Sequence, residues 1–344
     1  MKQTKKALLT LIILILVSTF CSCGFKAEQQ PSNAPSQGSN TQSLENQSAD
    51  SQNLEFQNSE TQNPETLTPE IQSNYSVFDS RGVEVFFERT PERIISLMPS
   101  NTEILYALNC GSSIVAVSDY CNYPEDTNNK QKLSTGEVLN VEAIIALDAQ
   151  AVILGNMSAM EDQINQLERA GVKVVVTEAN SLLQTYEVIE MIGNTMGRKA
   201  EAQLLIKDMK NGFEGIRKQA NQKDPIKIFV EVSPLEYGLW SCGKNTFIHE
   251  LIEIVGAKNI FENIEGWSAV SEEEVLTQSP DIIITTASSL TGIEDPVGQI
   301  KSRENWGNIQ AVKNNKVAMI DADMATRPGP RLLDAAKELI NIME

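Results

Sequence analysis

The chain has 344 residues and a formal net charge of −18 at pH 7. This acidic excess argues against nucleic acid as a partner, because binding to phosphates depends on neutralisation by Lys and Arg. The single histidine, His249, excludes a three-histidine zinc site, and five cysteines in so long a chain are not a disulfide framework. We therefore expect no resident metal or cofactor.

Residues 1–23 have the pattern of an export signal. Three lysines precede an apolar run over residues 7–17, which is shorter than the roughly 20 residues that span a bilayer. Ser22-Cys23 then resembles the lipobox of bacterial lipoproteins, and it fits better than Cys21, which follows a bulky residue. This resemblance implies that Cys23 is acylated and anchors the chain to the outer face of the cell membrane.

Residues 24–74 are a low-complexity segment that is rich in Gln, Ser, Asn, Thr, Glu and Pro. Such a segment has too few apolar residues to offset the entropy of ordering, so we expect a disordered tether. A flexible coil of about 50 residues has a root-mean-square reach of roughly 40 Å.

Residues 75–180 alternate short apolar strands with helices, as in a parallel α/β lobe. Strands are expected at 93–97, 113–118, 151–154 and 172–178, and helices at 101–111, 140–147 and 158–171. Asn101 is the expected cap of the first helix, and Gly111 is the expected stop.

Residues 181–222 are helical in pattern, with an expected break between Gly193 and Gly197. The part from 198 to 220 would extend for roughly 33 Å at 1.5 Å per residue. It is therefore long enough to connect two lobes.

The pattern restarts in residues 223–344. Strands are expected at 226–233 and 316–321, helices at 245–256 and 330–343, and a helix followed by a strand within 272–286. Segment 140–153 aligns without a gap on 271–284. This internal repeat predicts an α/β protein of two Rossmann-like lobes with similar topology, joined by a single long backbone helix, with a ligand cleft between them.

Five stretches point to a known family: PERIISLMPSNTEILYALNCG, VAVSDYCNYP, LSTGEVLNVEAIIALDAQAVI, GAKNIFENIEGWSAVSEEEVL and RPGPRLLDAAKELI. Through them the folded part resembles the helical-backbone class of solute-binding proteins of ABC importers, which serve cobalamin, haem and ferric siderophores. SDYCNYP, GWSAVSEEEVL and DMATRPGPR are most similar to the cobalamin-binding branch. The resemblance implies an extracytoplasmic, monomeric lipoprotein that delivers cobalamin or another corrinoid to a permease dimer with its ATPase subunits. A ferric siderophore or haem is the alternative ligand.

The resemblance also implies ligand-binding residues. They are Tyr120, Trp240 and Trp267, which match aromatic cleft positions, and Asp323 and Arg327, which match a polar pair near the last helix. Aromatic faces suit a corrin or a porphyrin. The polar pair could bind the amides of a corrinoid, Arg327 could bind an anionic siderophore, or the two residues could hold each other.

Glu142 and Glu273 match the carboxylate that each lobe of the family presents to arginines of the permease. Their repeat-equivalent positions would face one way, and paired Arg–carboxylate contacts suit docking. The alternative is that both are solvated helix residues. Gly136 and Gly155 stand where well-known cobalamin binders have Trp, so we expect a cleft that is wider or otherwise filled.

Two other functions compete with this interpretation. An enzyme on a doubly wound sheet would need a dinucleotide, Walker or nucleophile-elbow motif, and the sequence has none, so we expect no enzyme. A tethered surface adhesin or glycan-binding protein would need an open groove. We expect His249 to be an ordinary helix residue, and Cys110, Cys121 and Cys242 to be separate, inert thiols.

Overall fold

The computed structural model describes residues 72–344, apart from 137, 157–159, 221–224 and 288–292. The predicted signal, the lipobox at Cys23 and nearly all of the tether lie outside the described residues. The chain from Pro69 onward belongs to one compact unit. Over its described part, no helix combines the length and the apolar character needed to cross a bilayer.

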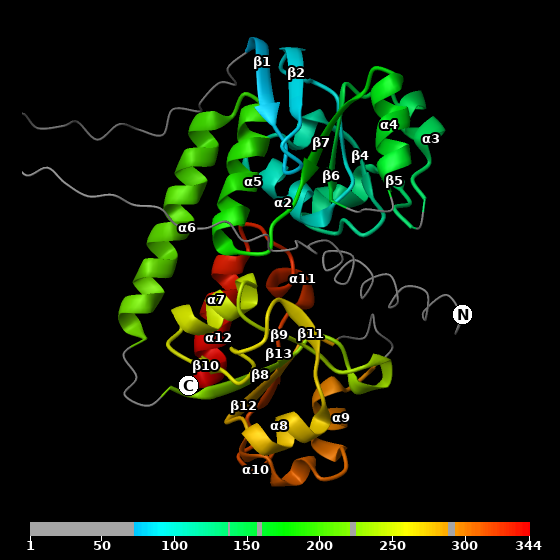
Figure 1. Ribbon diagram of the computed structural model, residues 1–344. Helices are drawn as coiled ribbons and strands as arrows, with labels where there is room; N and C mark the ends of the chain where they lie inside the picture. The colour runs from blue at the N-terminus through cyan, green and yellow to red at the C-terminus, as the bar shows by residue number, and fades with distance from the viewer. Residues whose placement is uncertain (1–71, 137, 157–159, 221–224, 288–292) are drawn as a thin grey trace, which may run out of the picture. The chain divides into compact units, whose positions relative to one another are not determined.

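Five parallel strands form the sheet of the first lobe, in the order β5-β4-β3-β6-β7 (Figure 1). They are β3 (Ile94–Ser96), β4 (Ile114–Ser118), β5 (Gln131–Leu133), β6 (Ala151–Gly155) and β7 (Lys173–Thr177). The accompanying helices are α2 (Pro99–Ala107), α3 (Val141–Ala146) and α4 (Glu161–Arg169). Every residue of β3 and β6 is buried, as the central strands of an all-parallel sheet require.

Four parallel strands form the sheet of the second lobe, in the order β10-β8-β12-β13. They are β8 (Lys227–Glu231), β10 (Lys258–Asn259), β12 (Ile282–Thr285) and β13 (Val317–Met319). The helices are α7 (Phe247–Ile254), α8 (Glu272–Gln278), α9 (Pro296–Ser302), α10 (Gln310–Lys313), α11 (Ala322–Ala325) and α12 (Leu332–Met343). The order β4-β3-β6-β7 of the first lobe recurs as β10-β8-β12-β13, so the predicted similarity of the two lobes is confirmed.

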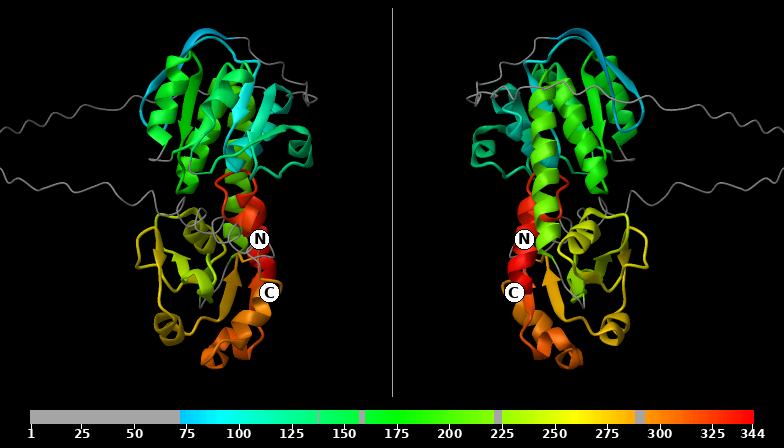
Figure 2. Two further views of the ribbon diagram at one scale, coloured as in Figure 1. Left: turned by 90° about the vertical axis from the view of Figure 1, so that its right-hand side faces the viewer. Right: turned by 90° about the vertical axis from the view of Figure 1, so that its left-hand side faces the viewer.

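The helical segment between the lobes is a pair of helices. They are α5 (Leu182–Thr195) and α6 (Lys199–Gln219), separated where the break was expected. α6 packs against α5 of the first lobe and against α7 and α12 of the second (Figure 2). The long connecting helix is therefore α6 alone, about 32 Å at 1.5 Å per residue.

Two antiparallel strand pairs were not predicted. They are β1 (Ser73–Phe78) with β2 (Glu84–Arg89), and β9 (Trp240–Cys242) with β11 (Trp267–Ala269). Ser73 pairs with Arg89, and the ring of Tyr75 stacks on Phe87 with centroids 5.4 Å apart. β1 therefore starts inside the segment 24–74 that was predicted to be a tether, two residues before the predicted start of the lobe.

The start and the end of α2 differ from the prediction. The helix begins at Pro99, because proline has a preset φ and its missing N–H costs nothing in the first turn. Asn101 is therefore not the cap. It is buried, and its Nδ2 donates to Oγ1 of Thr177 at 2.8 Å. The helix ends before Gly111, because Asn109 takes the left-handed conformation at φ 59°.

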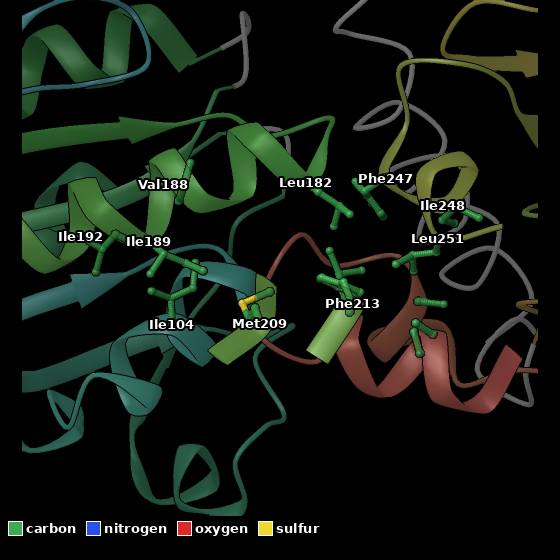
Figure 3. Close-up of a cluster of buried hydrophobic side chains, with 14 of the residues drawn as sticks. Ile104, Leu182, Val188, Ile189, Ile192, Met209, Phe213, Phe247, Ile248 and Leu251 are labelled. Carbon is green, nitrogen blue, oxygen red and sulfur yellow. The ribbon is translucent and has the colours of Figure 1, made fainter. Parts of the chain in front are cut away.

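One apolar core connects the two lobes around α6 (Figure 3). The labelled side chains come from α2, α5, α6 and α7, and they are Ile104, Leu182, Val188, Ile189, Ile192, Met209, Phe213, Phe247, Ile248 and Leu251. Close packing of this kind resists deformation. The connection between the lobes is therefore a packed core and not a flexible linker.

Candidate functional site

The predicted ligand-binding residues follow the carboxyl ends of parallel strands. Tyr120 lies two residues after β4, Trp240 lies on β9 after β8, and Asp323 and Arg327 follow β13. In open α/β sheets, ligands bind outside these strand ends. The two lobes thus contribute loops of the same kind to one region.

Arg327 is held by contacts to both lobes. Its Nη2 lies 2.6 Å from Oδ1 of Asp323 and donates to the backbone carbonyl of Tyr120 at 3.4 Å. Its Nη1 donates to Oε1 of Glu103 at 3.0 Å and to Oδ1 of Asn122 at 2.8 Å. Of the roles considered for Asp323 and Arg327, the structure shows the mutual one, since the two form an ion pair.

Glu103 is the buried centre of this arrangement. Arg331 Nε and Nη2 donate to its two carboxylate oxygens at 2.8 and 2.7 Å, and the Arg331 guanidinium lies 4.3 Å from the Tyr123 ring centroid. Asn122 Nδ2 donates to Asp323 Oδ2 at 2.6 Å. We call this group the Arg327 cluster: Glu103, Asn122, Asp323, Arg327 and Arg331.

Sequence reasoning missed Glu103, Asn122 and Arg331. Glu103 stands in the otherwise uncharged helix PSNTEILYA, and a buried charge needs a partner. Arg331 follows Arg327 within the short segment between α11 and α12, so two cations lie close together in the chain. These two signals would have suggested a buried ion pair, although not which residues form it.

The three aromatic residues differ in accessibility. The register of β9 and β11 places Trp240 and Trp267 in diagonal positions on one face. Trp267 is only 5% exposed and meets Phe247 edge-on, with centroids 5.4 Å apart. Tyr120 and Trp240 are half-buried, and burial and the neighbouring Asp119 raise the pKa of the Tyr120 phenol. Tyr120 and Trp240 therefore offer more surface to a ligand than Trp267 does.

Trp267 also forms part of a polar hollow of about 380 Å³ between the lobes. We call it the amide hollow, and it is lined by Asn180, Ser181, Gln184, Asn245, Glu265, Gly266 and Trp267. Beside it, the backbone N–H of Leu182 donates to Oε2 of Glu250 at 2.6 Å, which joins α5 to α7.

Gly136 and Gly155, which the resemblance singled out, have different surroundings. A Cβ on Gly155 would lie 2.3 Å from Sδ of Met98, so the Met98 side chain occupies this space. A Cβ on Gly136 would meet only the Ser134 hydroxyl, at 3.8 Å. The space at Gly155 is therefore otherwise filled, whereas Gly136 has room for a side chain.

Glu142 and Glu273 occupy the same place in the two lobes. Each is the second residue of its helix, after the caps Asn140 and Ser271, whose side chains accept backbone N–H groups of the first turn. Both glutamates are exposed. Their position favours a negative charge, because the helix dipole is positive at this end.

The three consecutive glutamates at the start of α8 differ in their hydrogen-bond partners. Oε2 of Glu272 accepts from Nε1 of Trp306 at 2.8 Å, and Oε2 of Glu274 accepts from the backbone N–H of Ser271 at 3.0 Å in a capping box. Among the residues that the structure describes, the Glu273 carboxylate has no such partner. It is the member of the run that is available to another molecule.

The lone histidine and the three cysteines in the described part are structural. No three of its His, Cys, Asp and Glu residues gather as a metal-binding set. His249 is buried in α7 with Nδ1 3.4 Å from Nδ2 of Asn259. Cys110, Cys121 and Cys242 are free and buried, and burial raises the pKa of Cys110 to about 11 and that of Cys242 to about 12. The prediction that the three thiols are separate is confirmed, and their burial is the environment expected of unreactive cysteines.

Two lobes of the same topology, a connecting helix and loops that meet at the strand ends define a two-lobe binding protein. Residues 94–324 match the periplasmic binding protein family, and the chain belongs to this family.

The similar proteins are all solute-binding proteins, and their names indicate different ligands. The chain is 36% identical over 270 residues to YvrC of Bacillus subtilis (strain 168), an uncharacterized ABC transporter substrate-binding lipoprotein, with 77% of this chain and 83% of the relative covered. It is 29% identical over 256 residues to the vitamin B12-binding protein of Salmonella paratyphi A, with 73% and 90% covered. The crystal structure of a possible iron-binding (periplasmic solute-binding) protein from Staphylococcus epidermidis gives a TM-score of 0.65 at 34% identity, with 74% and 99% covered.

The chain is thus a substrate-binding protein of the ABC type. Such proteins bind a solute outside the cytoplasm and work with a permease and an ATPase, and the relatives are transport proteins and not enzymes. Family membership also favours transport over the adhesin interpretation.

Proposed function

We propose that the protein captures a corrinoid such as cobalamin between its lobes. The main support for this class of ligand is that Arg327 is already paired within the protein. Its terminal nitrogens bind Glu103 and Asp323. A haem propionate or an anionic siderophore would have to take Arg327 from these carboxylates. Breaking a buried ion pair completely costs about 3–5 kcal/mol, and Glu103, which would keep Arg331, would lose part of that amount. A corrinoid carries mostly uncharged amides around a flat ring, which suits the half-buried faces of Tyr120 and Trp240.

A ferric siderophore or haem remains the second candidate ligand. The likeness to the possible iron-binding protein of Staphylococcus epidermidis supports it. Gly136 supports it as well, because this position lacks the aromatic side chain of well-known cobalamin binders and leaves room for a ligand of another shape.

We also propose how the loaded protein reaches its permease. Acylation of Cys23 anchors the chain to the outer face of the membrane, and residues up to about 72 act as the tether. Glu142 and Glu273, one on each lobe, dock the protein, which works as a monomer, on arginines of the permease dimer. The support is their equivalent place on α3 and α8 and their exposure.

The ligand proposal is tested by calorimetric titration of the full chain, purified in detergent, with cyanocobalamin and with haem. We expect one-to-one binding of cyanocobalamin, at least about tenfold tighter than the binding of haem. A tenfold difference in affinity corresponds to about 1.4 kcal/mol, and drawing Arg327 away from its carboxylates would account for it. Tyr120→Ala should weaken cyanocobalamin about tenfold through lost aromatic contact. Phe86→Ala is the matched control, since Phe86 is 44% exposed on β2, away from the strand ends. Tight haem binding without cyanocobalamin binding would withdraw the corrinoid.

A further inference from the structure

The amide hollow lies at the other end of the lobe interface from the Arg327 cluster. Asn180 to Gln184 follow β7, and Glu265 to Trp267 follow β10, which are edge strands of the two sheets. The cluster instead involves the loops after β4 and β13, toward the opposite edges. A ligand between the lobes would therefore have the cluster on one side and the amide hollow on the other.

The polar atoms of the hollow are only partly used by the protein. Oε1 of Gln184 accepts from the backbone N–H of Asn180 at 2.7 Å, which leaves the Gln184 amide N–H groups as donors. Nδ2 of Asn245 donates to Oε1 of Glu265, which leaves Oδ1 of Asn245 as an acceptor. One lobe thus contributes a donor and the other an acceptor to the same hollow.

We propose that the amide hollow is a binding subsite for an uncharged carboxamide group of the ligand, held by the Gln184 amide and the Asn245 carbonyl oxygen. This inference rests on the proposed function and narrows it to amide-bearing ligands. A carboxamide offers one carbonyl acceptor and two N–H donors, which complement the two free protein groups. Trp267 also lines the hollow, beside these polar groups.

The charge of the hollow favours an amide over a carboxylate. Glu265 lies at the hollow, and its one ion pair among the described residues is with the exposed Lys244, whose Nζ lies 3.5 Å from Oε2. An exposed pair of this kind is weak and screened by salt. A ligand carboxylate in place of the amide would meet the acceptor of Asn245 and the charge of Glu265, so the subsite selects the neutral group.

Gln184→Glu tests the donor without changing the local fold. A glutamate keeps the acceptor for the Asn180 N–H, removes the donor and adds one negative charge, which a control variant must account for. Gln184 is exposed and is the third residue of α5, where glutamate is favoured by the helix N-terminus. We expect the full chain with Gln184→Glu to bind cyanocobalamin about three- to tenfold more weakly, the effect of one lost hydrogen bond. Gln166→Glu on the exposed side of α4 adds the same charge and should leave the affinity unchanged.

A second measurement uses the separated monocarboxylic acids of cyanocobalamin, in each of which one peripheral amide is a carboxylate. One isomer should bind the wild type more weakly than cyanocobalamin does. The Gln184→Lys variant should bind that same isomer more tightly than it binds cyanocobalamin. This isomer would identify the amide that enters the hollow.

The outcomes separate the subsite from the proposed function. If the wild type binds cyanocobalamin and Gln184→Glu binds it equally well, or no more weakly than Gln166→Glu does, the subsite is wrong and the corrinoid function stands. If the wild type binds no cyanocobalamin, both are wrong. Equal binding of every monocarboxylic acid by Gln184→Lys and by the wild type would also overturn the subsite.

Discussion

Glu103 connects the two lobes through its carboxylate. Its side chain is 2% exposed, and it accepts hydrogen bonds from Arg327 and Arg331, which belong to the segment between α11 and α12. Charge-assisted hydrogen bonds with Arg are strong, and the two-point contact with Arg331 fixes geometry as well as energy. An anionic ligand would have to compete with Glu103 for Arg327.

Glu103→Gln should lower the free energy of unfolding by about 3 kcal/mol or more, because two arginines then lose a buried charged partner. The measurement is urea unfolding of the full chain. Asp334→Asn removes the carboxylate of an exposed pair with Lys337, and it should cost less than about 0.5 kcal/mol. A similar small loss for both changes would show that the cluster contributes little to stability.

Two of the five residues of the Arg327 cluster were predicted from the sequence. Asp323 and Arg327 are four residues apart and could be recognised as a pair from a local motif. Glu103 lies 224 residues from Arg327, and only the tertiary fold brings them together. Contacts between segments that are distant in the sequence also determine that Trp267 is buried and Trp240 is half-exposed. No local sequence pattern encodes such contacts.

Close packing of α5 against α6 depends on a glycine. A Cβ on Gly193 would lie 2.4 Å from the Cβ of Ala202 and 3.1 Å from the carbonyl oxygen of Arg198. Neither of these is the end of a flexible side chain. In contrast, a Cβ on Gly215 of α6 would meet nothing within 4 Å. The two helices thus carry one glycine that packing requires and one that it does not.

Gly193→Ala should lower the free energy of unfolding by about 1–3 kcal/mol, since overpacking must push α5 and α6 apart. Gly215→Ala should raise it by about 0.5–1 kcal/mol, because alanine loses less backbone entropy in a helix. Denaturant unfolding of both variants measures the difference. If both changes raise stability equally, the helices tolerate separation and the connection is looser than its packing indicates.

The elements that the sequence predicted are those with a local signature. Buried parallel strands are short apolar runs between helices, and β3, β4, β6, β7, β8, β12 and β13 were all expected. β9 and β11 have three residues each and pair across the whole of α7 and β10, so no turn signal marks them. The break between α5 and α6 was predictable, but their side-by-side packing was not, because it depends on which faces meet.

At the scale of the whole molecule, the repeat places two comparable surfaces on the two lobes. Beside Glu142 in the sequence, Val138 and Ile145 are 65% and 42% exposed. Glu273 lines a hollow of about 580 Å³ together with apolar residues such as Ile264 and Val270. Interfaces combine an apolar centre with charged groups that set orientation. A pair of such surfaces suits a permease dimer, which presents the same groups twice.

Reversing both charges with Glu142→Lys and Glu273→Lys should abolish uptake of the ligand and leave its affinity in solution unchanged. The reason is that lysine would face arginines of the permease, while neither glutamate lies among the residues that we assign to ligand binding. Uptake is measured in vesicles that contain the permease and the ATPase, and affinity is measured by calorimetry. The glutamate–arginine contact also predicts that binding to the permease weakens as salt is added.

Charge reversal at these positions has a side effect that the control must separate. Lysine in the first turn of α3 and α8 opposes the helix dipole and costs about 0.3–1 kcal/mol at each site. Thermal unfolding therefore accompanies the assay, and Glu187→Lys with Glu190→Lys on the exposed side of α5 makes the same change of net charge elsewhere. Normal uptake by the control and none by the docking variant would assign the effect to Glu142 and Glu273. Normal uptake by both would show that the permease recognises another surface, because a change of four charge units at a true docking site cannot be neutral.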